Sequence, residues 1–237
     1  MQIESGRVSV QGIATPSPAT LVTPDAAITV DGPARRFVSR GGDKLDGALE
    51  RFDVAVEGRL WLDAGASTGG FTDRLLQGGA AAVAAVDVGY GQLDWGLRND
   101  PRVVVMERTN VRTLEAGDLP WSPDGVVADL SFISLRIVLP ALASVANADA
   151  DWVLLVKPQF EVGRDSLGRG GVVREPELWL RALDEVVASA EAEGLSLVAA
   201  APSPLQGPAG NHEFFIHLRR GTPTNRDALN RAVEELA

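Results

Sequence analysis

The sequence predicts an α/β fold: a doubly wound seven-stranded sheet that is mostly parallel, with helices on both faces. Two observations lead to this prediction. From about residue 42 onward, short apolar runs alternate with longer segments of helical periodicity. The runs are apolar at nearly every position, which is typical of parallel strands covered by helices on both faces.

Each expected strand is a short apolar run that ends at a turn residue or a charged residue. The seven strands span residues 59–65, 81–89, 102–108, 124–131, 151–158, 195–204 and 211–220. The last two follow each other with no helix between them. We therefore expect these two to form a hairpin, in which the final strand runs antiparallel.

The segments between these strands show the apolar spacing or the end signals of helices. The expected helices span residues 43–52, 68–79, 134–146, 175–194 and 224–237. Pro140 should kink or break the third of them, because proline cannot donate the helical hydrogen bond. Thr224 or Asn225 should cap the last helix.

Residues 1–33 differ in composition from the rest of the chain. Two β-prone runs, RVSV and AITV, lie between glycine and proline turns. A segment of this length is too small to bury a core alone. The Asp-Gly-Pro turn at residues 31–33 marks a boundary. We therefore expect an N-terminal module over residues 1–33, a linker over 34–40 and the main domain over 41–237.

The composition excludes several classes of function. No apolar run approaches the roughly 18 residues of a membrane helix, and the N-terminus lacks the pattern of a secretory signal. These features favour a cytoplasmic protein. The chain contains no cysteine and only two histidines, His212 and His217. We therefore expect neither a thiolate nucleophile nor a metal site.

The charge argues against one mode of nucleic-acid binding. A net charge of −10 disfavours binding by the surface as a whole. A local basic patch is still possible, because residues 35–44 hold three arginines and Lys44 against the single acid Asp43.

The most informative local motif is a glycine-rich turn in the stretch WLDAGASTGGFTDRLL, residues 61–76. A strand ends at Asp63, the turn follows and a helix begins, which is where ligands bind in such sheets. The spacing G-x-x-x-G-G differs from the G-x-G-x-x-G of dinucleotide-binding proteins. An acid before the first glycine suits a ligand with a positive ammonium group, such as S-adenosylmethionine. The alternative is a tight turn that binds no ligand.

Asp87 ends the second expected strand, where an acid can hydrogen-bond ribose hydroxyls. Together with the glycine-rich turn, it predicts a nucleoside-binding site. NAD would use the same acid, so Asp87 alone does not separate the two cofactors.

Three charged residues lie at or near the ends of buried strands: Asp129, Lys157 and Glu213. Neighbouring strand tips are about 5 Å apart, so Asp129 and Lys157 can meet. A lysine at the tip of a buried strand costs desolvation energy unless it is paired or has a task. The alternatives are ordinary ion pairs at a sheet end, or a Lys157 that has left the sheet for solvent. Strand alternation places Glu213 and Phe215 on one face.

Several motifs together resemble one known family. The stretches FVSRGGDKL, DAGASTGGFTD, VADLSFIS, VKPQFEVGRD, GRGGVVRE and NHEFFIHL resemble the TlyA-type members of the FtsJ-like ribose 2′-O-methyltransferases, which also go by the name hemolysin A. The match runs from about Arg36 to Arg220. It implies a Rossmann-like methyltransferase that uses S-adenosylmethionine to modify ribosomal RNA.

The resemblance also implies roles for individual residues. The family's catalytic tetrad corresponds to Lys44, Asp129, Lys157 and Glu213. The residues expected to bind the cofactor are Asp63, Gly65, Ser67, Thr68, Gly69, Gly70, Phe71, Asp87, Asn110 and Asp129. The loop at residues 166–174 would flank the substrate.

Residues 3–32 resemble the second half of the RNA-binding module, of the small-subunit ribosomal-protein type, that precedes the catalytic domain in this family. The first half of that module, with the helices that carry much of its basic surface, has no counterpart in this sequence. The resemblance therefore implies a partial module, with ribosomal RNA or ribosomal subunits as partners and no membrane.

The implied chemistry explains why a lysine would end a buried strand. A ribose 2′-hydroxyl is a poor nucleophile and must lose its proton as it attacks the methyl group on a sulfonium. Lys157 can accept this proton only in its neutral form, which burial and a nearby cation such as Lys44 favour. Asp129 and Glu213 would then orient the two ammonium groups.

Three other functions stay open from the sequence. An NAD-dependent oxidoreductase would share the fold, although the glycine spacing argues against it. A methyltransferase acting on another substrate fits if the partial N-terminal module does not bind ribosomal RNA. A membrane-active, non-catalytic hemolysin is the third, but no amphipathic basic helix supports it.

Overall fold

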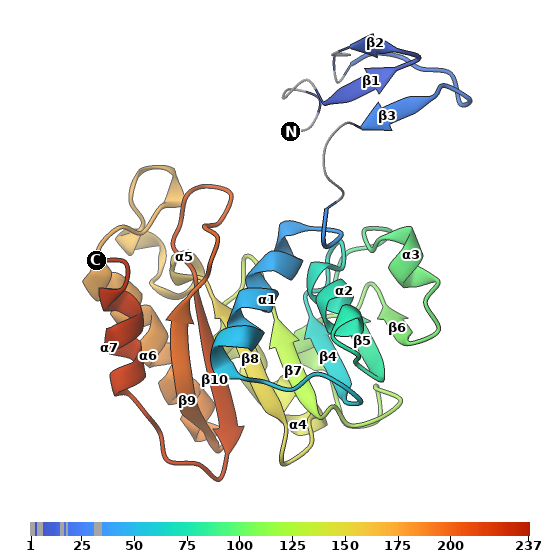
Figure 1. The fold of residues 1–237 in the computed structure, drawn as a ribbon. Helices are drawn as coiled ribbons and strands as arrows, with labels where there is room; N and C mark the ends of the chain where they lie inside the picture. Colours follow the sequence, from blue (N-terminus) through green and yellow to red (C-terminus); the bar gives the residue numbers. More distant parts are fainter. Residues whose placement is uncertain (1–2, 4–6, 15–16, 18, 31–34) are drawn as a thin grey trace. The chain divides into compact units, whose positions relative to one another are not determined.

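Two β-sheets organise the chain, which the computed structural model describes over residues 3, 7–14, 17, 19–30 and 35–237 (Figure 1). The chain divides into two units, Met1–Arg36 and Phe37–Ala237. In the first unit, β1 (Val8–Val10) pairs antiparallel with β2 (Ile13–Ala14) and β3 (Ile28–Val30). The β-prone runs of the sequence thus form β1 and β3. The expected boundary at residues 31–33 lies outside the described residues.

The second unit is built on a seven-stranded sheet in the order β6-β5-β4-β7-β8-β10-β9. Its strands are β4 (Leu60–Ala64), β5 (Ala82–Val86), β6 (Val103–Met106), β7 (Gly125–Ala128), β8 (Asp151–Val156), β9 (Leu195–Pro202) and β10 (Phe214–Arg220). β10 runs antiparallel to its neighbours β8 and β9, while the strands from β6 to β8 pair in parallel. The prediction of a mostly parallel sheet with an antiparallel final strand is confirmed.

Helices connect these strands. The α-helices are α1 (Arg40–Phe52), α2 (Gly70–Gln77), α3 (Trp95–Arg98), α4 (Leu135–Val145), α5 (Pro158–Glu161), α6 (Pro176–Ala192) and α7 (Asp227–Glu234). The short 3₁₀ turns are η1 (Val111–Thr113), η2 (Arg164–Ser166) and η3 (Arg169–Gly171). The short helices α3 and α5 follow strand ends and were not predicted from the sequence.

The first helix of the second unit begins earlier than predicted. The side chain of Ser39 caps α1 by accepting a hydrogen bond from the backbone N–H of Gly41, so the helix starts at Arg40. It ends where Asp53 adopts a left-handed conformation, with a φ of 52°. The earlier start brings Lys44 into the second turn of the helix.

Two other predictions for the helices concerned Pro140 and the cap of the last helix. Pro140 lies inside α4, which runs through it without interruption. The prediction that Thr224 or Asn225 caps the last helix is wrong. Arg226 occupies the cap position of α7 and makes no side-chain capping hydrogen bond.

The two faces of the sheet carry separate hydrophobic cores. α1 and α2 cover one face (Figure 1), where Leu45 and Leu75 join the same buried cluster as Trp61 and Leu155 of the strands. Because side chains alternate along a strand, the residues that β5 and β8 contribute to this cluster lie two positions apart. The helix-covered faces explain why the strands are apolar throughout.

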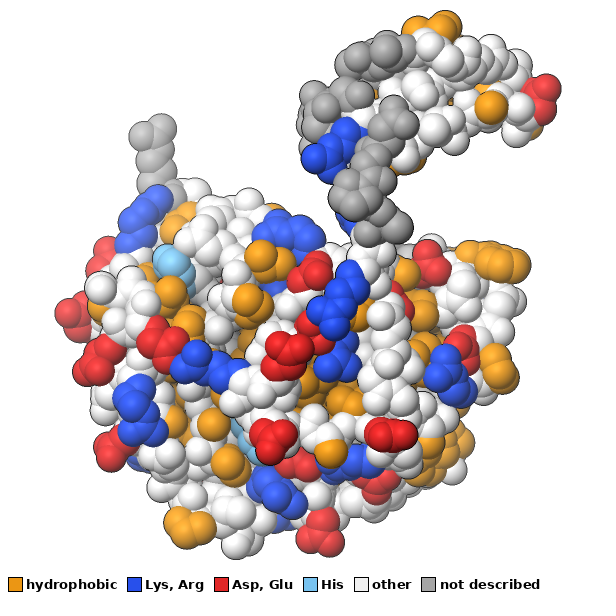
Figure 2. All heavy atoms as spheres, in the orientation of Figure 1, with side chains coloured by type: hydrophobic (Ala, Val, Ile, Leu, Met, Phe, Trp, Pro, Cys, Tyr) orange, Lys and Arg blue, Asp and Glu red, His pale blue; other side chains and the backbone are white. Residues whose placement is uncertain are grey.

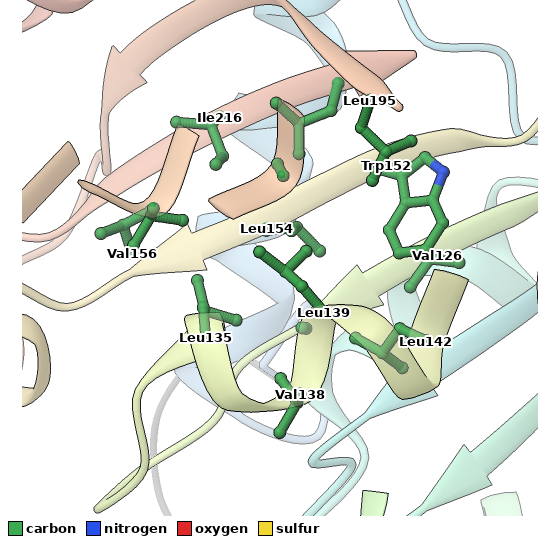
Figure 3. Packing of buried hydrophobic residues seen from close by; sticks show 14 of the residues in the cluster. Val126, Leu135, Val138, Leu139, Leu142, Trp152, Leu154, Val156, Leu195 and Ile216 are labelled. Carbon is green, nitrogen blue, oxygen red and sulfur yellow. The ribbon is translucent and has the colours of Figure 1, made fainter. Parts of the chain in front are cut away.

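α4, α6 and α7 belong to the core on the opposite face. Figure 3 shows Leu139 and Leu142 of α4 packed toward Trp152 and Leu154 of β8. All four side chains are fully buried. Burying each contributes about 1.5–3 kcal/mol relative to leaving it exposed, so this layer fixes β8 in place and with it the strand end that precedes Lys157.

Charged side chains of both signs are interspersed over the face of the second unit that Figure 2 shows. Lys44, which the sequence places in a basic segment, is 7% exposed and contributes nothing to a surface patch. The exposed cations of the segment are arginines. In the part of the chain that the structure describes, we find no helix long and apolar enough to cross a membrane.

Candidate active site

Four charged residues gather at one edge of the seven-stranded sheet, on the face that α1 and α2 cover. The strand residues of the core on this face include Trp61, Val127, Leu155 and Phe215. Two positions from each of these, and therefore on the same face, lie Asp63, Asp129, Lys157 and Glu213. Asp63 is the second-last residue of the parallel strand β4, while Asp129 and Lys157 directly follow the parallel strands β7 and β8. Glu213 immediately precedes the antiparallel β10 rather than lying within it. Strand direction and side-chain alternation together bring the four to this edge.

Asp129 and Lys157 meet as the sequence predicts. The Nζ of Lys157 lies 2.5 Å from Oδ1 of Asp129 and donates a hydrogen bond to Oγ of Ser131 at 3.0 Å. The side chain of Lys157 is 10% exposed. This burial excludes the alternative in which Lys157 has left the sheet for solvent.

Lys44 and Glu213 form a second, more deeply buried ion pair. Their Nζ and Oε2 atoms lie 2.5 Å apart, and the side chains are 8% and 1% exposed. The β10–β8 ladder pairs Phe214 with Val156. One step further along this ladder, Glu213 comes next to Lys157. The two ion pairs therefore draw on α1, β7, β8 and β10 at neighbouring strand ends.

The glycine-rich turn after β4 is shaped by close backbone approaches. Gly65 has a φ of +88°, and a Cβ at this position would lie 2.7 Å from the backbone oxygen of Asp129, so only glycine fits. Ser67 also has a positive φ, 48°. Its N–H donates to Oδ2 of Asp87 at 2.8 Å. The turn thereby joins the ends of β4, β5 and β7.

A pocket of about 500 Å³ opens between these strand ends, beside the point where the strand order reverses at β4. Asp87 and Asn110 line it, together with apolar side chains such as Leu130 and Val138. The carboxylate of Asp87 is held by the N–H groups of Ser67 and Gly89. This is the position at which ligands bind in doubly wound sheets.

A smaller hollow of about 160 Å³ adjoins this pocket, because Gly65, Ser67, Asp129 and Ser131 line both. Lys157 lines the smaller hollow. Between them, the two hollows are lined by these residues expected at the cofactor: Gly65, Ser67, Thr68, Gly70, Phe71, Asp87, Asn110 and Asp129. The ion pair of Asp129 and Lys157 thus borders the same space as the glycine-rich turn.

Asp63 and Gly69 do not line either hollow. Asp63 is fully buried; its Oδ2 accepts a hydrogen bond from the hydroxyl of Thr72 at 2.6 Å. Its Oδ1 has no hydrogen-bond partner among the described residues. Burial raises the pKa of Asp63 to about 7 against the lowering effect of Thr72, and the charges of Asp129 and Asp87 add to the rise. Gly69 has a positive φ and caps α2.

Lys44 and Glu213 also lie outside the lining of the two hollows. Glu213 reaches the same edge of the sheet through the backbone register of β10. Lys44 reaches it from α1, one turn after Gly41, which does line the smaller hollow. Among the described residues, no group of three or more His, Cys, Asp or Glu side chains could hold a metal ion.

The sequence reasoning did not single out Ser131 and Phe132, which lie two and three residues after Asp129. Ser131 lines both hollows and accepts the hydrogen bond from Lys157. Phe132 is 91% exposed, has a φ of 64°, and its ring centre lies 5.2 Å from that of Phe160. An aromatic residue beside a charged strand end was the available signal.

Comparison with known proteins agrees with this site. The FtsJ-like methyltransferase family model matches residues 37–220. The 16S/23S rRNA (cytidine-2′-O)-methyltransferase TlyA of Mycobacterium tuberculosis is 53% identical over 98% of this chain and 90% of its own length. A solved Streptococcus thermophilus protein with a provisional hemolysin name superposes with a TM-score of 0.83 at 41% identity, covering 98% of this chain and 88% of that one.

This chain belongs to the FtsJ-like methyltransferase family. The predicted family, enzyme class and cofactor, S-adenosylmethionine, are confirmed. A solved S-adenosylmethionine-dependent methyltransferase from Mesorhizobium loti shares the fold, with a TM-score of 0.55 at 12% identity over 73% of this chain and 96% of that one. The predicted Rossmann-like methyltransferase fold is confirmed as well.

Proposed function

We propose that this FtsJ-like methyltransferase transfers a methyl group from S-adenosylmethionine to a ribose 2′-hydroxyl of ribosomal RNA. The observation that carries the proposal is the Asp129–Lys157 ion pair, which borders the hollow beside the glycine-rich turn. The named activity of the M. tuberculosis relative supports the same substrate class. The cytoplasm, where ribosomal RNA is found, is the location we propose with it.

The residues at the strand ends fit S-adenosylmethionine. The larger pocket offers a carboxylate, Asp87, for ribose hydroxyls and apolar walls for a base. A side chain at Gly65 would fill the space where the turn approaches Asp129. Asp63 precedes Gly65 by two residues, and we propose its Oδ1, which has no hydrogen-bond partner among the described residues, as an acceptor for an ammonium group. When bound, the cofactor supplies an electrophilic methyl group on a positively charged sulfur.

The chain's own task is to hold the hydroxyl and to take its proton. In this proposal Lys157, which lines the smaller hollow, accepts the proton at its Nζ. Asp129 and Ser131 fix the direction of its amine. General-base assistance of this kind contributes about 10²–10⁴-fold to a rate.

We propose that Lys44 and Glu213 complete the tetrad with Asp129 and Lys157. The carboxylate of Glu213 is nearly fully buried and holds Lys44 by a direct ion pair. In register beside Lys157, this pair places a second charged pair next to the proposed base.

The N-terminal unit is proposed to be part of an RNA-binding module. Its exposed cations include Arg7 and Arg35. Each phosphate contact made by such a residue contributes to affinity and to its salt dependence. The charge reversals Arg7→Glu and Arg35→Glu should therefore lower the affinity for ribosomal RNA and flatten its dependence on salt, without changing the affinity for S-adenosylmethionine.

The activity is tested by the transfer of labelled methyl groups from S-adenosylmethionine to unmodified small and large ribosomal subunits and to free ribosomal RNA. We expect label in RNA with the wild-type chain. Absence of label from every RNA, with cofactor binding intact, would mean that the substrate is not ribosomal RNA. Lysis of cells by the purified protein, equal in wild type and Lys157→Ala, would instead favour the hemolysin hypothesis.

A further inference from the structure

We infer that Glu161, at the end of α5, is a positioning residue of this site: it fixes the β7–α4 loop, residues 129–134, against the segment that begins at Lys157. The catalytic meaning of this inference rests on the proposed function, because it acts through Asp129 and Lys157. Glu161 itself lines neither hollow.

Glu161 is 4% exposed and is surrounded by donors from the start of α4. The hydroxyl of Ser134 donates to its Oε2, and the N–H of Leu135 donates to its Oε1 at 2.8 Å. The guanidinium of Arg136 lies 3.4 Å from Oε2 and also donates to the backbone oxygen of Glu161 at 3.0 Å. One carboxylate thereby ties three consecutive residues to α5.

The other end of the same loop is tied to the other end of the same segment. Asp129 forms the ion pair with Lys157, and Ser131 accepts a hydrogen bond from it. Between these two attachments, the ring of Phe132 contacts that of Phe160. The loop and the segment 157–161 are thus joined at both ends and in the middle.

The backbone of this loop needs such restraint. Phe132 has a φ of 64° although it is not a glycine, and its side chain is 91% exposed. Conformations of this kind cost free energy and persist only where the surroundings fix them. Since the exposed ring of Phe132 gains little from burial, the hydrogen bonds that Glu161 accepts at residues 134 and 135 provide a large part of the restraint.

Glu161 lines neither hollow, so its buried carboxylate must be explained by its contacts within the protein. Burial raises the pKa of Glu161, and the donors from Ser134, Leu135 and Arg136 only partly offset this. Its acceptors face the N-terminus of α4, where a negative charge is favoured. A residue that served only to fill the core could be apolar at lower cost, so its polar contacts point to the loop as its purpose.

The test compares Glu161→Ala with Glu185→Ala in the full chain. Glu185, on α6, also pairs with Arg136, at 2.8 Å, and its other ion pair is with Arg181 of the same helix rather than with the loop. We expect amide hydrogen exchange at residues 129–134 to speed up by about tenfold or more in Glu161→Ala and to stay at the wild-type rate in Glu185→Ala. Glu161→Gln, which keeps the side-chain volume, should show the same change to a smaller degree and serves if Glu161→Ala does not fold.

Turnover gives the second readout. Misplacement of the base lowers kcat, so we expect Glu161→Ala to lose about tenfold or more in kcat per folded molecule while KM for RNA changes by less than about threefold. A merely structural residue would lower the melting temperature and leave both unchanged. Unaltered exchange at 129–134, or unaltered kcat beside a lowered melting temperature, would overturn the inference. If the wild type methylates no RNA, the proposed function fails, and the exchange comparison alone decides the role of Glu161.

Discussion

Asp129 and Lys157, at the ends of the neighbouring parallel strands β7 and β8, form an ion pair of 2.5 Å in which the lysine is 10% and the aspartate 24% exposed. A lysine at the tip of a fully buried strand is thus both paired and largely removed from water. Its pairing partner borders both hollows at the strand ends. In the proposed reaction, this lysine takes the proton from the ribose hydroxyl.

Replacing Lys157 removes the proposed base. We expect Lys157→Ala to lose about a hundredfold or more in kcat, because general-base assistance contributes about 10²–10⁴-fold. Cofactor affinity should stay close to that of the wild type, since Lys157 does not line the larger pocket, which holds Asp87 and Asn110. Single-turnover kinetics and calorimetric titration with S-adenosylmethionine measure the two effects. Normal turnover in this variant would show that another group takes the proton.

The buried Lys44–Glu213 pair should be costly to break on one side only. Glu213→Leu leaves the ammonium of Lys44 buried without its partner, which costs about 3–5 kcal/mol of unfolding free energy. Replacing both, in Lys44→Met/Glu213→Leu, should cost clearly less. Arg51→Ala is the control, since the Arg51–Glu235 pair is 51% and 38% exposed and such pairs contribute about 0–1 kcal/mol. Urea unfolding of the four proteins gives the comparison, and equal losses for single and double variants would contradict it.

The protonation of Asp63 should make stability depend on pH. Its pKa is raised from 3.8 to about 7 by burial, so the folded protein binds this proton more tightly than the unfolded chain does. Stability from this group is therefore present in full below about pH 4 and is lost as the pH rises to about 7. The loss is on the order of a few kcal/mol.

Asp63→Asn removes this ionisation and keeps an acceptor for Thr72. We expect the variant to melt at a higher temperature than the wild type at pH 8, with the difference shrinking toward pH 4. The same variant should bind S-adenosylmethionine more weakly, because the carboxylate proposed to accept the ammonium group of the cofactor is gone. Thermal melts at pH 4, 6 and 8 test the first expectation. A difference that stays constant over this range would show that Asp63 does not titrate there.

Gly65 and Gly58 form a matched pair for testing the turn. Both have a positive φ, +88° and +71°, but a Cβ at Gly65 would meet the backbone oxygen of Asp129 at 2.7 Å whereas one at Gly58 meets nothing within 4 Å. Each alanine substitution carries the backbone strain. Only Gly65→Ala should also weaken binding of S-adenosylmethionine, by about tenfold or more. Equal cofactor affinity in both variants would show that the close approach at Gly65 does not shape the site.

The sequence was sufficient for the sheet and for most of the pocket. Strands buried on both faces have a simple apolar pattern. The polar residues that end them, such as Asp87 and Asp129, indicate the edge of the sheet at which a ligand would bind. The antiparallel direction of the final strand was predicted only from the absence of a helical segment between the last two strands. These inferences need only the local pattern and the rule that parallel strands end at one edge.

What the sequence could not predict depends on contacts between distant segments. The pairing of Lys44 with Glu213 joins residues that are 169 positions apart, and only the family resemblance, not the local pattern, placed the two together. The contribution of Glu161 depends on three donors at the start of another helix. The exposed position of the Phe132 ring depends on a positive φ, which no local propensity favours. The wrong cap of α7 has the same origin, since the position of Arg226 beside Asp184 and Glu191 is a tertiary feature.

The most direct test of the central claim is the identity of the methylated nucleoside. Ribosomal RNA treated with the wild type and with Lys157→Ala would be digested to nucleosides and analysed by mass spectrometry. A 2′-O-methylated nucleoside formed by the wild type and absent with the variant is the predicted result. A methyl group on a base, or the same 2′-O-methylated product at the same rate from Lys157→Ala, would contradict the proposed reaction at this site.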